Sequence, residues 1–158
     1  QQIAIGRVSS PRPLAPSEAM NGTLAAIDAN SLSFAATYVV ALVLVGIVLT
    51  ARVAFFRMSQ KVGIGDGGNQ ALAQRIRVHS NFSEQTPLIL AILVLLPMLG
   101  ASEWLVHSVG FTGLLGRVLH ALGLGQSIGK SFGRVYGMLL TWTSLFIGMI
   151  GLLVLAWR

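Results

Sequence analysis

The chain has 158 residues, of which 54% are hydrophobic and 10% are charged, whereas soluble globular domains carry about 25% charged residues. This composition predicts an integral membrane protein and argues against a soluble one. The formal net charge of +6 would suggest nucleic acid as a partner of a soluble protein, but the Lys and Arg residues lie near the ends of apolar segments, so we attribute them to topology and anionic lipid headgroups and expect no nucleic acid.

Residues 1–30 differ from the rest of the chain. The stretch "SSPRPLAPSEAMNG" is rich in Pro, Ser and Ala, and it contains no apolar run long enough for the core of a signal peptide. We predict a flexible N-terminal tail over residues 1–30, followed by one membrane domain over residues 31–158. Met20 is a candidate for the true start, in which case the preceding residues would not belong to the native protein.

Four apolar segments follow, and each is near the length of about 20 residues that a transmembrane helix needs. The predicted spans are residues 31–51, 71–102, 104–124 and 135–157. Within the second span, Pro87 and Pro97 are expected to kink or end the helix. Too few polar residues remain to cover a soluble protein, and the apolar runs do not alternate as they would in a membrane barrel. We therefore predict an all-α fold, a four-helix bundle embedded in the lipid bilayer.

The charges of the loops predict an orientation. Arg57 and Lys61 lie in the first loop, and Lys130 and Arg134 lie in the third, whereas the second loop has no Lys or Arg. Positively charged loops stay on the cytoplasmic side. We expect the first and third loops to be cytoplasmic and both termini to be periplasmic, in a bacterial inner membrane.

The sequence gives little support for a metal site or a phosphate-binding loop. Cysteine is absent, which excludes disulfides and thiolate ligands, and the three histidines show no close repeat spacing, so we predict no metal site. The loop "GIGDGG" lacks the Lys-Ser/Thr pair and the preceding strand of a phosphate-binding loop. We interpret it as a turn, in which Asp66 either caps the second helix or pairs with an Arg.

Polar residues inside the second span point to a functional site. Arg77, Asn81 and Glu84 are spaced i, i+4, i+7, which places them on one helix face. They could form a structural network of ion pairs. They could equally form a pocket for a small zwitterion, because Arg binds a carboxylate in a fork, Glu accepts from an ammonium and Asn can do either. The spacing alone does not choose between these two interpretations.

The third and fourth spans add further cations. Arg117 and His120 share a face of the third span, where Gly116 and Gly123 would allow close helix approach. We expect Arg117 to meet Glu84 or an anionic ligand, and we count Arg117 and His120 as candidate binding residues, although His120 could simply be a packing residue. Arg134 opens the fourth span, either as an interfacial anchor or as part of the site. Because several cations face a single embedded carboxylate, the sequence favours an anionic ligand or lipid.

These motifs resemble the MAPEG family, the membrane-associated proteins in eicosanoid and glutathione metabolism, and especially its small bacterial members. The resemblance runs from about Phe34 to the C-terminus. It rests on "GDGG", on "RVHSNFSEQTP" with the pattern R-x-H-x-N-x-x-E, on "GRVLHALG", and on Arg134. It implies a homotrimer of four-helix subunits that binds glutathione between neighbouring subunits near the cytoplasmic side.

The resemblance also implies roles for individual residues. Arg77, Asn81 and Glu84 match second-helix glutathione contacts, and His120 matches a third-helix contact. Arg134 matches the Arg that family enzymes place near the thiol, where a cation lowers the thiol pKa and supplies the thiolate nucleophile. Arg134 is therefore the candidate catalytic residue. The resemblance also gives either Arg52 or Arg57 as a first-helix contact with glutathione.

The chain departs from the family enzymes at several hydroxyl positions. A third-helix Tyr is replaced by Leu124, and a fourth-helix Ser and Tyr are replaced by Val135 and Met138. In the second-helix pattern, Val78 stands where the eukaryotic branch can have Glu. These losses remove donors that would hold glutathione or its thiolate.

Two functions follow as hypotheses. The first is a glutathione S-transferase or peroxidase-like enzyme, with glutathione as co-substrate and a lipophilic electrophile entering from the bilayer. The second is a non-catalytic protein of the same fold, serving as an accessory subunit or scaffold of a larger membrane complex. Transport finds less support, because the spans show no inverted repeat or pair of broken helices.

Overall fold

The computed structural model describes residue 15 and residues 29–158, and this part of the chain contains four helices and no strand. The helices are α2 (Ala29–Gln60), α3 (Gln70–Met98), α4 (Glu103–Gln126) and α5 (Phe132–Ala156). The predicted all-α fold is confirmed. The predicted tail lies outside the described residues except for Ala15 and the first two residues of α2, and Met20 lies outside them as well.

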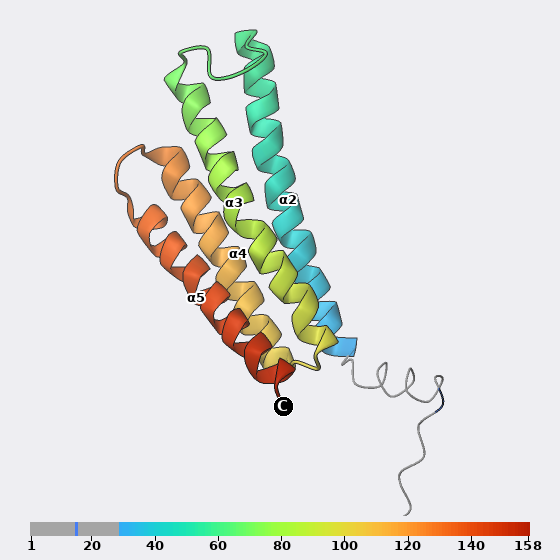
Figure 1. The fold of residues 1–158 in the computed structure, drawn as a ribbon. Helices are drawn as coiled ribbons and strands as arrows, with labels where there is room; N and C mark the ends of the chain where they lie inside the picture. Colours follow the sequence, from blue (N-terminus) through green and yellow to red (C-terminus); the bar gives the residue numbers. More distant parts are fainter. Residues whose placement is uncertain (1–14, 16–28) are drawn as a thin grey trace, which may run out of the picture.

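The four helices run side by side with alternating direction (Figure 1). The α2–α3 and α4–α5 loops lie at one end of the bundle, and the α3–α4 loop and the C-terminus lie at the other. At the first of these ends, which we call the two-loop end, α2 and α3 project beyond α4 and α5. All four helices are long and apolar enough to cross a membrane.

The first helix is longer than the predicted span. We expected it to end at Ala51, but α2 continues for nine residues to Gln60. With 32 residues it measures about 48 Å, which exceeds the roughly 30 Å of the hydrocarbon core. The charges of Arg52 and Arg57 end the apolar segment without ending the helix, because Arg is a good helix former. Lys61, with φ of 55°, terminates the helix in the left-handed conformation.

The turn before α3 corrects the expectation for Asp66. The cap of α3 is Asn69, whose side-chain oxygen accepts from the backbone N–H groups of Ala71 at 3.0 Å and Leu72 at 3.1 Å. Asp66 instead accepts from the backbone N–H of Gly68 at 2.9 Å, which closes the turn. The cap of α3 therefore lies three residues after the predicted position, at Asn69 and not at Asp66.

The prolines of α3 have different consequences. Pro87 lies inside the helix and does not end it. Pro97 lies in the last turn, and the helix ends one residue later at Met98. Gly100 then adopts a φ of 71°, which is open to glycine at little steric cost and lets the chain turn into α4.

Helices α4 and α5 touch through glycine backbones. A Cβ atom added at Gly116 would lie 2.7 Å from the backbone N of Thr141, and one added at Gly123 would lie 2.5 Å from the backbone N of Arg134. On the facing helix, a Cβ at Gly133 would lie 2.7 Å from the carbonyl oxygen of Leu119. The predicted close approach at Gly116 and Gly123 is confirmed, and small residues of this kind are what brings membrane helices together.

This packing predicts opposite effects for two Gly→Ala substitutions in α4. Gly116→Ala should lower the free energy of unfolding by about 1–3 kcal/mol, because its Cβ would meet the α5 backbone, which cannot move aside without separating the helices. Gly125→Ala meets nothing within 4 Å and should be neutral or raise stability by up to about 1 kcal/mol. Thermal unfolding in detergent micelles compares the two. Equal melting temperatures would contradict the glycine contact.

Candidate functional site

Arg117 is fully buried in the middle of the bundle. Its Nη2 donates to Oδ1 of Asn81 at 2.8 Å, and its Nη1 donates to Oγ1 of Thr141 at 3.4 Å. The guanidinium also lies over the ring of Phe82, with its carbon 5.8 Å from the ring centroid. Arg117 therefore links α3, α4 and α5 through partners that are all uncharged.

This finding differs from the expected contact between Arg117 and Glu84. Glu84 instead accepts from Nη1 of Arg77 at 3.3 Å, along the same helix. The side chains of Arg77 and Glu84 are 62% and 49% exposed, whereas Asn81 is 9% exposed. The three residues lie on adjoining parts of the helix surface, so that Asn81 turns into the bundle and the other two face outward.

His120 lies one turn after Arg117 on α4 and is also buried, at 4% exposure. Three buried side-chain nitrogens in the described part of the chain lack a hydrogen-bond partner, and two of them are Nε of Arg117 and Nδ1 of His120. The third, Nη1 of Arg57, lies near the end of α2. Buried polar atoms are normally paired, so these two nitrogens, one turn apart on α4, are buried groups with unused hydrogen-bonding capacity.

Arg134 is half-buried at the start of α5, and its guanidinium points back to the α4–α5 loop. Its Nη1 donates to the carbonyl oxygens of Ile128 and Gly129, each at 2.6 Å. The backbone N–H of Arg134 donates to Oγ of Ser131, the helix cap, at 3.4 Å. In this arrangement Arg134 holds the loop together.

Several charged residues nevertheless lie within electrostatic range of His120. The cations Arg77, Arg117 and Arg134 all act electrostatically on His120, and Glu84 is the acid that acts on Arg117. We call these five residues together with Asn81 the His120 cluster. It holds three permanent positive charges and one negative charge. Of the charged members only Arg117 is fully buried, and a buried cation is costly unless an anion balances it, so the cluster is suited to binding an anionic group.

The cluster consists of six candidate residues named from the sequence, whereas Arg52 and Arg57, the two candidates for a first-helix contact, lie outside it. Two residues that contribute to it were not predicted as members: Thr141 and Phe82, which contact the guanidinium of Arg117. A lone Thr on α5 and an apolar residue on α3 give no sequence signal for such a contact. Within the described residues, no group of three or more His, Asp or Glu side chains could hold a metal ion.

Comparison with known proteins places the chain in a family. Residues 35–154 match the sequence profile of the MAPEG family. The chain is 35% identical over 91 residues to the inner membrane protein YecN of Escherichia coli K12, and this match covers 58% of the chain and 68% of the relative. The protein of the same name from Escherichia coli O6:H1 gives the same figures. No solved structure matches. The family profile covers most of the chain, so this integral membrane protein belongs to the MAPEG family.

Proposed function

We propose that this protein binds glutathione at the His120 cluster and acts on lipophilic electrophiles as a glutathione S-transferase or peroxidase-like enzyme. The observation that carries the proposal is the buried Arg117, whose partners are neutral and whose Nε lacks an acceptor. The inner-membrane name of the relatives supports a bacterial inner-membrane location. The loop charges support cytoplasmic first and third loops and periplasmic termini.

The chemistry of glutathione complements the cluster. Glutathione carries two carboxylates, one ammonium and one thiol. The unpaired Nε of Arg117 can donate to a carboxylate, and Glu84 can accept from the ammonium. Glu84 would have to exchange Arg77 for the ligand, so that an ion pair with the ammonium replaces the ion pair with the guanidinium. Arg77 is then available to the second carboxylate.

Arg134 is the proposed activating cation. A positive charge beside the thiol lowers its pKa and supplies the thiolate, which attacks an electrophile dissolved in the bilayer. For this role the guanidinium has to leave the carbonyls of Ile128 and Gly129 and turn toward the ligand. Catalytic hydrogen bonds often form only in the complex, so this resting position is compatible with the role.

A homotrimer is part of the same proposal. In a single subunit, Arg77 and Glu84 are about half exposed although they lie well inside a predicted span. Ion pairs at such depth normally face protein or a water-filled cavity. A neighbouring subunit would cover them and would close the glutathione site, as the family resemblance implies.

One observation favours the second candidate, a non-catalytic accessory subunit or scaffold of a larger membrane complex. Arg134 already donates to two loop carbonyls and so has a structural role. Hydroxyl donors of the family enzymes are also replaced by Leu124, Val135 and Met138. Such a protein would keep the cluster for folding alone and would not respond to glutathione.

Glutathione titration separates the two candidates. We expect millimolar glutathione to raise the melting temperature of the purified protein, because a ligand that binds only the folded state stabilises it. Glu84→Gln should weaken binding by roughly tenfold or more, since a hydrogen bond to a charged group contributes about 1.5–3 kcal/mol. Glu103→Gln, at the other end of the bundle, is the control and should bind normally. A wild-type protein that does not respond would support the scaffold.

The role of Arg134 is tested by kinetics with a model electrophile. Arg134→Ala should lower kcat by about 10²–10³-fold, and the pH at which the rate reaches half its maximum should rise, because the thiol loses its cation. The control is Lys130→Ala, which removes a cation from the preceding loop. If Arg134→Ala conjugated the electrophile as fast as the wild type, the assigned role would be wrong.

The contact between Arg117 and Asn81 predicts an asymmetry in stability. Asn81→Leu leaves the buried guanidinium without its shortest hydrogen bond and should lower the free energy of unfolding by about 1–3 kcal/mol. Arg117→Met removes the charge itself, so it should be close to neutral while abolishing the response to glutathione. Thermal unfolding with and without glutathione measures both effects. A strongly destabilised Arg117→Met variant would indicate that the charge serves the fold.

A further inference from the structure

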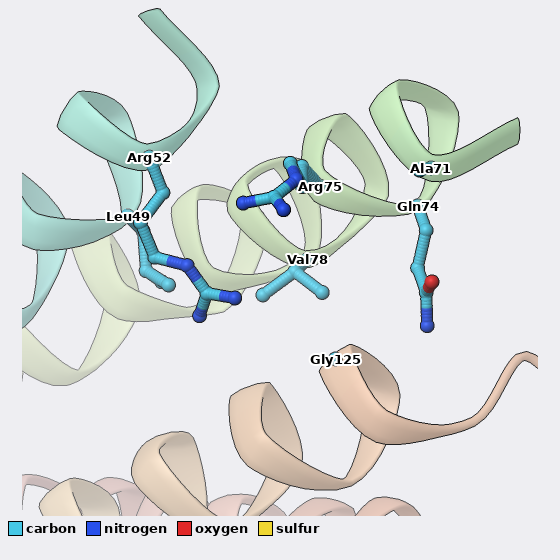
Figure 2. A pocket seen from close by; sticks show the side chains of 7 residues that line it. All are labelled: Leu49, Arg52, Ala71, Gln74, Arg75, Val78 and Gly125. Atoms are coloured by element: carbon cyan, nitrogen blue, oxygen red, sulfur yellow. The ribbon is translucent and has the colours of Figure 1, made fainter. Parts of the chain in front are cut away.

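A second cationic cavity lies between α2, α3 and α4 at the two-loop end. It has a volume of about 80 Å³, several times the roughly 10–15 Å³ that one water needs. Figure 2 shows Arg52 reaching into it from α2 and Arg75 from α3, while the side chain of Gln74 extends toward α4. Leu49 and Val78 form its apolar wall. The cavity shares no residue with the His120 cluster, but it includes Arg52, which is one of the two residues, with Arg57, that the family resemblance offers as a first-helix glutathione contact.

Two of the three polar side chains of this cavity, those of Arg75 and Gln74, are held in place by other residues. The guanidinium of Arg75 lies over the ring of Phe56, 4.1 Å from its centroid. Nε2 of Gln74 donates to the carbonyl oxygen of Leu124 at 2.8 Å, which ties α3 to the end of α4. Neither Arg52 nor Arg75 forms an ion pair with an acid of the described residues. Two arginines without an acid, facing one space, are complementary to a phosphate group.

An apolar groove on the outer surface adjoins the cavity. This groove, of about 280 Å³, runs between α2 and α4 and shares Leu49 and Arg52 with the cavity. Its other walls include Val48 on α2 and Leu122 on α4, which are 58% and 53% exposed. Because α2 and α4 both run toward the two-loop end, the groove leads from the arginines toward the middle of the membrane.

We propose that this combined feature is a binding site for an anionic phospholipid. The phosphate lies between Arg52 and Arg75, and an acyl chain lies in the α2–α4 groove. A soluble phosphate would use the arginines and leave the groove empty, whereas a zwitterionic lipid would place an ammonium near two cations. A cationic cavity and an apolar groove that share Leu49 and Arg52 therefore favour a lipid with net negative charge.

The test adds phosphatidylglycerol, phosphatidylcholine with the same acyl chains, or inorganic phosphate to the delipidated full-length protein. Native mass spectrometry and the melting temperature report binding. We expect phosphatidylglycerol to bind at least tenfold more tightly than phosphatidylcholine and to raise the melting temperature more than inorganic phosphate does. Arg52→Gln combined with Arg75→Gln should lower the affinity for phosphatidylglycerol at least tenfold, whereas Lys130→Gln, which removes a cation outside the cavity, should not.

A second variant separates the lipid from a free anion. Val48→Trp fills the groove without changing any charge, so it should weaken binding of phosphatidylglycerol and leave binding of inorganic phosphate unchanged. It also keeps the test decisive if the double arginine variant does not fold. Equal binding of the two lipids, or an unchanged affinity in Val48→Trp, would overturn the proposal. So would displacement of phosphatidylglycerol by glutathione, which would assign the cavity to the glutathione site.

Discussion

The buried charge of Arg117 is the constraint on which the centre of the bundle depends. A guanidinium in the interior of a membrane domain has to find partners, because neither lipid nor water is available to solvate it. Its partners come from two other helices, Asn81 on α3 and Thr141 on α5. Thr141 reaches it only because Gly116 lets the backbones of α4 and α5 touch. The glycine contacts and the polar cluster are therefore one arrangement, in which close packing of small residues brings a hydroxyl to a buried cation.

Charge is distributed along the bundle in two zones with different surroundings. Near the two-loop end, Arg52 and Arg75 line a cavity that adjoins an exposed apolar groove. Deeper in the bundle, Arg117 and His120 are enclosed by helices. An anion that reaches the first zone can arrive through the bilayer as part of a lipid, whereas an anion that reaches the second has to displace a contact of Arg77 or Arg134. The same kind of side chain is thus suited to different ligands, because burial decides what can approach it.

The helices and most of their ends could be predicted from the sequence, because continuous apolar segments have one solution in a membrane. Candidate residues could be named from the sequence, but their contacts could not. At about 100° per residue, Asn81 and Glu84 are separated by roughly 60° around α3, although they lie near Arg77 in the same stripe. The position of α4 against α3 decides which side of that stripe is buried. That position depends on the glycines through which α4 packs against α5. Asn69 displaced Asp66 as the cap for a local reason that spacing could have revealed, since it directly precedes the first turn of α3.

The resting position of Arg134 bears directly on whether this site works as an enzyme. Its two hydrogen bonds go to neutral carbonyl oxygens, and a bond between a guanidinium and an anion is stronger than either of them. A thiolate could therefore draw Arg134 from the loop, provided that the loop tolerates losing both bonds. With Leu124, Val135 and Met138 in place of hydroxyl-bearing residues, no other donor at these positions would help. Activation of the thiol would then depend only on the positive charges of Arg134, Arg117 and Arg77. Whether the site is catalytically active therefore depends on whether the α4–α5 loop can release Arg134.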